Sequence, residues 1–206
     1  MFYRNRDSYD SQLWFLFFDA EDQGNGGIPG WGWAEGASAF RSDISNFYNT
    51  TTESFSFFLL LDMVGGHDLE FMDEMYSNNQ LQEAVFKEGR ELGYTREFPK
   101  NPTQRWITDD HGPFRNMMPV LDLIIDFIGG PWTHHHTHSD NLENIDVNSL
   151  EATGSTVESF IYTYHGQTTW NQNYTKWIIV GSIGGAAFIG VAVGFLIVNK
   201  RRKKFV

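Results

Sequence analysis

Four runs of acidic and histidine residues, spaced tens of residues apart, are the part of this sequence most able to do chemistry. They are residues 19–22 (DAED), Asp62, residues 109–111 (DDH) and residues 134–140 (HHHTHSD). The first two follow apolar runs, 13–18 and 55–61, that are typical of buried strands, and open α/β sheets build their sites at the carboxyl ends of such strands. Because bare carboxylates gathered there would repel one another and resist desolvation, a cation or shared protons must compensate them. With imidazole nearby, zinc is the expected cation.

The same runs carry a resemblance to a known family. In chain order, four segments resemble the site motifs of the zinc-dependent aminopeptidases of the co-catalytic zinc exopeptidase class, whose superfamily also holds the glutaminyl cyclases. The segments are FFDAEDQG (17–24), LLDMVG (60–65), TDDHGPF (108–114) and HTHSDNLENID (136–146). The resemblance covers roughly residues 13–164. It implies an α/β fold, a three-layer sandwich with a mixed central sheet, of which this chain holds the C-terminal half without the N-terminal strands.

The resemblance also implies roles for individual residues. Glu21 is expected to be the general base, which takes a proton from zinc-activated water as that water attacks a peptide carbonyl. Asp110 is expected to line the site as a second catalytic residue. The three expected zinc ligands are Asp22, Asp62 and His136. Apart from the resemblance, Trp132 is expected to form an apolar wall of the substrate pocket, with aromatic core filling as the default alternative.

Plainer interpretations of these residues stay open. Glu21 can be a solvated acid at a strand end, and Asp62 can cap the following turn. Asp110 can make a local Asx turn. In single-zinc cyclases, the residue matching Asp62 carries a proton rather than binding metal. Three further histidines can be outer hydrogen-bond donors, exposed loop residues or alternative ligands: His134, His135 and His138.

One departure from the family affects the metal site. The family supplies a His and a metal-bridging Asp from strands upstream of its equivalent of Glu21, whereas the residues that precede Glu21 here include no His. We therefore expect either a piece of a longer protein, such as a truncated gene model, or a degenerate relative. Three functions follow: a zinc aminopeptidase that hydrolyses amino-terminal peptide bonds, which we favour, a glutaminyl-peptide cyclotransferase with one zinc, or a non-catalytic ectodomain.

The C-terminal region predicts a membrane anchor. Residues 177–198 carry no charge and would span about 33 Å as a helix, enough for a bilayer core. The run KRRKK at 200–204 follows and marks the cytoplasmic side. The domain is expected to lie outside the cell and the anchor in the cell membrane. The expected order is a polar leader (1–11), an exopeptidase-like domain (12–166), a stalk (167–176), a single transmembrane helix (177–198) and a basic cytoplasmic tail (199–206).

Charge and composition limit the classes of partner that the chain is expected to bind. The chain has 15 Lys and Arg against 26 Asp and Glu, a net charge of −11, which disfavours nucleic acid. The resemblance implies a peptide substrate, and the C-terminal run predicts the membrane as the other partner. There is no Cys, so the fold gains nothing from disulfides.

The hydrophobic pattern predicts the elements that must position these residues. Apolar runs predict strands over 12–18, 54–62 and 118–125, with a further short strand over 68–71. Amphipathic periodicity predicts helices over 79–92 and 148–162.

Overall fold

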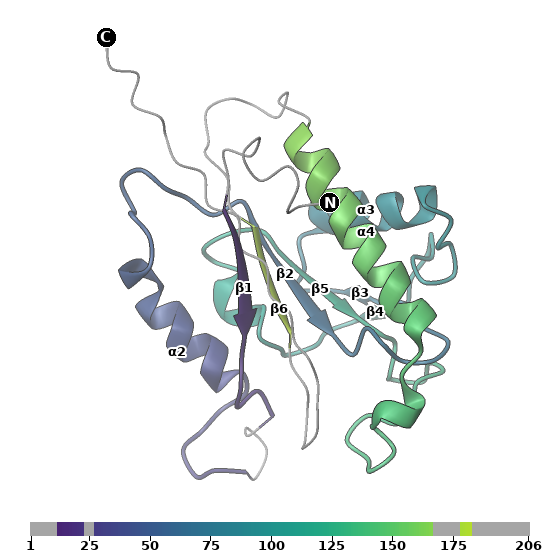
Figure 1. Cartoon of the computed structure of the whole chain (residues 1–206). Coiled ribbons are helices and arrows are strands. Elements are labelled where there is room, and N and C mark those ends of the chain that lie inside the picture. Colours follow the sequence, from purple (N-terminus) through teal and green to yellow (C-terminus); the bar gives the residue numbers. More distant parts are fainter. Residues whose placement is uncertain (1–11, 23–26, 167–177, 183–206) are drawn as a thin grey trace.

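The computed structural model describes residues 12–22, 27–166 and 178–182 (Figure 1). The main sheet contains, in spatial order, β1 (Leu13–Phe17), β6 (Ile178–Ser182), β2 (Phe57–Asp62) and β5 (Val120–Ile124). A small second sheet pairs β3 (Asp73–Glu74) with β4 (Gln104–Arg105). The helices and the short 3₁₀ turns are α2 (Glu35–Asp43), α3 (Asn79–Glu91), α4 (Val147–Gly166), η2 (Ile44–Asn46), η3 (Gly112–Phe114) and η4 (Leu142–Asn144).

Helices cover both faces of the main sheet. α2 lies against one face, and α3 and α4 lie against the other (Figure 1). Along β2, Phe57 and Leu59 belong to the apolar cluster that contains residues of α3 and α4, whereas Phe58 and Leu60 belong to the cluster that contains residues of α2. Because successive strand residues point to opposite faces, a strand covered on both sides must be apolar throughout. The expected α/β fold is confirmed, and with it the buried strand that ends at Asp62.

Local sequence sets the limits of α3. The side chain of Asn78 accepts a hydrogen bond from the N–H of Leu81 at 3.0 Å and caps the start of the helix. The helix ends at Glu91, and Gly93 follows with φ of 97°, a conformation that glycine adopts without steric cost. The helix predicted over 79–92 is therefore found almost where the pattern places it.

The described sheet differs from expectation in its strand directions. Every neighbouring pair in the main sheet is parallel, whereas a mixed sheet was expected. A helix lies between β1 and β2 and another between β2 and β5, and a helical crossover returns the chain in the same direction. The strand expected over 68–71 is reduced to an isolated antiparallel bridge between Phe71 and Ile125.

The predicted transmembrane helix, 177–198, lies mostly outside the described residues. The part that the structure describes, Ile178–Ser182, is strand β6, which pairs with both β1 and β2. Its first three residues are β-branched and favour extended backbone. Within the described ranges, no helix has the length and apolar character needed to cross a bilayer. The predicted leader, stalk and tail also fall outside the described residues.

Candidate active site

One cavity of about 330 Å³ opens at the carboxyl ends of the parallel strands. It brings together three residues that the sequence assigns to chemistry, Glu21, Asp62 and His136. Its volume is in the range of small-molecule sites, roughly 300–1,000 Å³. The other residues that line it are Trp33, Met63, Trp106, Ile107, Thr108, Asp109, Ile124, Phe127 and His135.

The loop after β1 holds Glu21 against the start of α2. The N–H of Ala34 donates to the carbonyl of Glu21 at 2.9 Å, and the N–H of Glu35 donates to the carbonyl of Ala20 at 3.2 Å. Ala20 has φ of 55°, a left-handed conformation that costs energy for a residue with a side chain. Such a conformation persists only where neighbouring contacts impose it, so the position of Glu21 is fixed by its surroundings.

Glu21 has the electrostatic character of a general base. Burial, and then the charges of Asp109 and Asp22, raise its pKa from 4.5 to about 8. A carboxyl that titrates near neutrality can both accept and return a proton at physiological pH. Asp22, an expected ligand, acts on Glu21 through its charge but is not among the residues that line the cavity.

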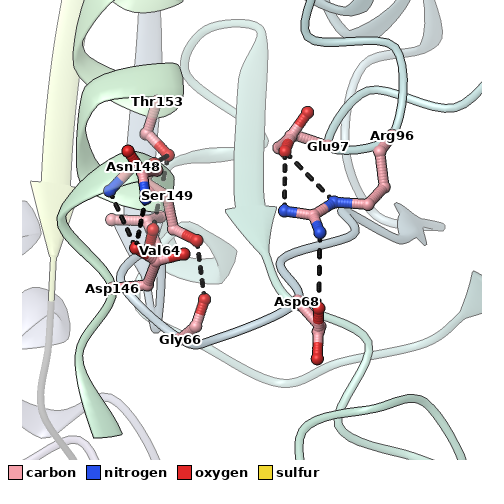
Figure 2. A network of polar contacts seen from close by, with 9 residues as sticks. All are labelled: Val64, Gly66, Asp68, Arg96, Glu97, Asp146, Asn148, Ser149 and Thr153. Carbon is pink, nitrogen blue, oxygen red and sulfur yellow. Dashed lines mark hydrogen bonds and ion pairs between the residues drawn. The ribbon is translucent and has the colours of Figure 1, made fainter.

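The loop after Asp62 is fixed to the start of α4 (Figure 2). Ser149 Oγ donates to the carbonyl of Gly66 at 2.8 Å. The N–H of Asp146 donates to the carbonyl of Gly65 at 2.7 Å. These bonds satisfy loop carbonyls in a region where water is largely excluded. They hold the carboxyl end of β2, and therefore Asp62, in a defined place.

Trp132 lies beneath this loop rather than on the cavity wall. It is buried in the apolar core, and a Cβ on Gly66 would come within 2.6 Å of its ring. Its ring also meets that of His134 edge-on, with centroids 4.8 Å apart. The tryptophans that line the cavity are Trp33 and Trp106. Trp132 thus supports the Asp62 loop from the core side.

Asp109 and Asp110 point to different environments. Asp109 lines the cavity, whereas Asp110 is fully buried and lies outside the cavity lining. Both carboxyl oxygens of Asp110 lack a hydrogen-bond partner within the described part of the chain. Burial, and then the charges of Asp109, Glu21 and Asp19, raise the pKa of Asp110 to about 9. Asp110 was expected to line the site. In the structure Asp109 lines the cavity and Asp110 does not.

The side chains of Asp62 and Asp109 interact with each other. Burial raises the pKa of both, and the hydrogen bond between their side chains raises the pKa of Asp62 further while lowering that of Asp109. These directions favour the protonated form of Asp62 over that of Asp109. Asp62 Oδ1 has no hydrogen-bond partner among the described residues. A buried, unpartnered carboxyl oxygen is costly, and a cation would relieve that cost.

The histidine-rich loop brings two imidazoles to the cavity. The rings of His135 and His136 stack with centroids 3.9 Å apart, and the ring of His135 lies 4.2 Å from that of Phe127. Burial, and then the charge of His136, lower the pKa of His135 to about 4, so His135 is neutral at physiological pH. His136 has φ of 57°, the left-handed conformation that Ala20 also adopts in the loop that carries Glu21. His138 is exposed and does not line it.

A buried polar group behind the cavity was not anticipated from the sequence. His111 Nε2 lies 3.0 Å from Glu74 Oε2, and His111 Nδ1 lies 3.6 Å from Asp122 Oδ2. All three side chains are buried. The sequence alone assigns no role to Glu74 or Asp122. One signal was present, because Asp122 interrupts an otherwise apolar strand, VLDLI, and a charge there needs a partner.

The donor types at the cavity fit zinc. Carboxylate and neutral imidazole are zinc ligands, and Asp62 and His136 line the same space. The unpartnered oxygen of Asp62 is a further indication. Within residues 12–22, 27–166 and 178–182, however, no three His, Cys, Asp or Glu side chains converge as a metal site would. The chemistry of the donors supports zinc, while a complete ligand set is not assembled in the described part.

The sequence matches Peptidase family M28 over residues 2–161. The chain belongs to this family. Among curated relatives, this M28 chain is similar to a glutaminyl-peptide cyclotransferase of Dictyostelium discoideum, with 27% identity over 132 residues, which cover 58% of this chain and 34% of the relative. The superfamily suggested by the motifs is thereby confirmed.

Solved structures of both activities resemble the M28 chain. A Bacteroides thetaiotaomicron glutaminyl cyclase bound to N-acetylhistamine is 31% identical, with a TM-score of 0.60, and the match covers 70% of this chain and 52% of that one. A Zn-dependent exopeptidase from Parabacteroides distasonis is 32% identical, with a TM-score of 0.59 and coverage of 70% and 52%. The chain thus spans about half the length of these structures. Their likeness does not separate peptidase from cyclase.

Proposed function

We propose that this chain provides the catalytic cavity of a zinc-dependent aminopeptidase. The observation that carries the proposal is the meeting of Glu21, Asp62 and His136 in one cavity at the carboxyl ends of the strands. Glu21 has the raised pKa that a general base needs. Membership of Peptidase family M28 and the likeness to a Zn-dependent exopeptidase support the same chemistry.

In this proposal, Asp62 and His136, which line the cavity, would be two of the residues that hold zinc. When bound, it would polarise the scissile carbonyl and promote attack by water. Glu21 would take the proton from the attacking water and pass it to the leaving amine, so its carboxyl returns to its starting state. The unusually high pKa of Glu21 suits the second half of that transfer.

The lining of the cavity favours a substrate with a free amino terminus and an apolar first residue. Asp109, which lines the cavity, would in its ionised form attract the substrate's ammonium group. Trp33, Ile124 and Phe127 would contact an apolar side chain and exclude water from the reacting bond. We therefore expect leucine or phenylalanine to be preferred over charged residues.

A glutaminyl-peptide cyclotransferase is the second candidate. The curated relative and several solved relatives are glutaminyl cyclases, and the raised pKa values of the neighbouring Asp62 and Asp109 suit a reaction in which acids carry protons. The substrate's amine would attack its own side-chain amide carbonyl. Glu21 would carry a proton from that amine to the departing ammonia.

Product analysis separates the candidates. The purified full chain, supplied with zinc, is given a leucyl anilide and, separately, a peptide with amino-terminal Gln. Release of leucine identifies the aminopeptidase, and loss of ammonia with retention of all residues identifies the cyclotransferase. If zinc binds and neither product forms, both proposals fail and a non-catalytic ectodomain is the remaining interpretation.

We also propose that the chain is attached to the cell membrane, with its C-terminus in the cytoplasm. The uncharged run 177–198 and the basic run after it support this. In the structure residues 178–182 form strand β6. A chain anchored through a membrane helix over 177–198 would have to lose that strand. Alkaline carbonate washing of native membranes tests the attachment, because an integral anchor resists it and a peripheral protein is released.

A further inference from the structure

The buried carboxylate of Glu74 binds the chain on both sides of the segment that presents Asp109. Its Oε1 accepts the N–H of Ile107 at 3.2 Å, and its Oε2 lies 3.0 Å from His111 Nε2. Thr108 and Asp109, which line the cavity, lie between these two attachment points. A carboxylate that holds both ends of a short segment restricts where its middle can go.

Glu74 is itself fixed. The N–H of Tyr76 donates to both of its oxygens at 3.0 Å, and Ser77 Oγ donates to Oε2 at 3.0 Å. The N–H of Asp122 in β5 donates to the same Ser77 Oγ at 2.9 Å. Although burial pushes the pKa of Glu74 upward, its contact with His111 and these donors lower the pKa overall, so Glu74 is ionised and is a strong acceptor.

His111 is the basic group in contact with these buried acids. Glu74 faces it from β3 and Asp122 faces it from β5, and the charge of His111 also acts on Asp109. Burial and the surrounding carboxylates raise the pKa of Asp122 well above its ordinary value. The two ring nitrogens of His111 thus lie between the carboxyl groups of Glu74 and Asp122.

We propose that His111 is a positioning residue: through Glu74 and Asp122 it fixes the 107–111 segment so that Asp109 stays in the cavity wall. The backbone of the same segment supports this geometry, because the N–H of Gly112 donates to the carbonyl of Asp109 at 2.9 Å and the N–H of Asp110 donates to Asp109 Oδ1 at 2.6 Å. His111 does not line the cavity, so it acts only through Asp109. The expected effect of His111 on turnover rests on the proposed function.

The test compares His111→Phe, His111→Gln and wild type in the full chain with zinc. Phe keeps a ring in the buried site without donors, and Gln keeps an amide donor for Glu74. His111→Phe is expected to lower kcat about 100-fold with little change in KM, because a small displacement of a reacting group has an effect of that size. His111→Gln is expected to recover part of that loss.

Two control variants separate positioning from stability. His67→Asn changes an exposed histidine outside the cavity and should leave kcat unchanged. Gly89→Ala puts a Cβ within 2.3 Å of the Phe98 ring in the distant core and should lower the melting temperature without lowering kcat per folded molecule. The two variants are compared at equal loss of melting temperature. If His111→Phe then lowers kcat no more than Gly89→Ala does, His111 has only a structural role and the proposal is overturned.

Amide hydrogen exchange tests the positioning without any turnover. Loss of the His111 contacts should speed exchange at Gly112 about tenfold or more, relative to amides of α3, since a lost bond to a charged group is worth at least that factor. Unchanged exchange at Gly112 would overturn the proposal. If the wild type turns over neither substrate, the proposed function fails, and the Gly112 exchange still decides the role of His111.

Discussion

Asp109 faces the cavity, while Asp110, the next residue, is fully buried behind it and has no hydrogen-bond partner for either carboxyl oxygen among the described residues. Two acids adjacent in sequence therefore have different expected roles. Asp109 interacts with the side chain of Asp62 at the carboxyl end of the sheet. Asp110 is an acid held neutral by burial.

Asparagine substitutions should separate these roles. Asp109→Asn is expected to lower kcat about 100-fold or more, since it removes a charge and a proton acceptor at the reacting centre. Asp110→Asn should change kcat little and raise the melting temperature, because the amide removes a buried ionisable group. Steady-state kinetics and thermal melts at pH 8 measure both effects. Equal loss of kcat in the two variants would contradict the assignment.

Glu21→Gln should abolish turnover while the chain stays folded. The amide has nearly the same shape but cannot accept a proton, and general-base catalysis contributes about 100-fold to 10,000-fold. Because the pKa of Glu21 is raised, its ionised form is disfavoured in the folded state, so the variant should also melt at a higher temperature. A folded Glu21→Gln variant with wild-type kcat would exclude Glu21 as the base.

The metal-free chain should lose stability as pH rises from about 5 to about 9. Glu21 and Asp110 have folded-state pKa values of about 8 and about 9, raised from 4.5 and 3.8. Over that interval the folded state binds more protons than the unfolded state, so the free energy of unfolding falls with pH. Thermal melts across this range measure the slope. Zinc should reduce this dependence of stability on pH, because a cation compensates the ionised carboxylates. A free energy of unfolding that rises with pH in the metal-free chain would refute these pKa directions.

Gly66→Ala should destabilise the loop after β2. Its Cβ would meet the Trp132 ring at 2.6 Å, and overpacking of this kind costs typically about 1–3 kcal/mol. Gly154→Ala in α4 is the matched control, because nothing lies within 4 Å of its Cβ and Ala favours a helix interior over Gly by about 1 kcal/mol. Urea unfolding should show opposite signs for the two variants. Equal stability in both would contradict the packing of Trp132 beneath the loop.

Much of the fold follows from local patterns in the sequence. The apolar runs before Glu21 and Asp62 predict β1 and β2, and the run before Ile125 predicts β5, because strands buried on both faces must be apolar. The end of α3 follows from Gly93. The segment that forms α2 gave no clear apolar stripe, and its start at Ala34 has a left-handed backbone, φ 56°, that local sequence does not announce.

The site was predictable only as far as strand ends could place residues. Glu21, Asp62 and His136 meet as expected because parallel strands bring their carboxyl ends to one edge. Which of two adjacent acids faces the cavity depends on the direction of a turn, and that direction is fixed by Glu74, far away in sequence. Long-range contacts of this kind leave little trace in a single sequence.

The central claim is that the cavity works with zinc, and removing and returning the metal tests it most directly. The purified full chain is dialysed against a chelator, assayed on leucyl anilide, and assayed again as zinc is added back, beside a His136→Ala variant. The account predicts that turnover disappears with the metal, returns with zinc, and needs a higher zinc concentration in His136→Ala. Undiminished turnover in chelated protein from which zinc is shown to be absent would contradict it.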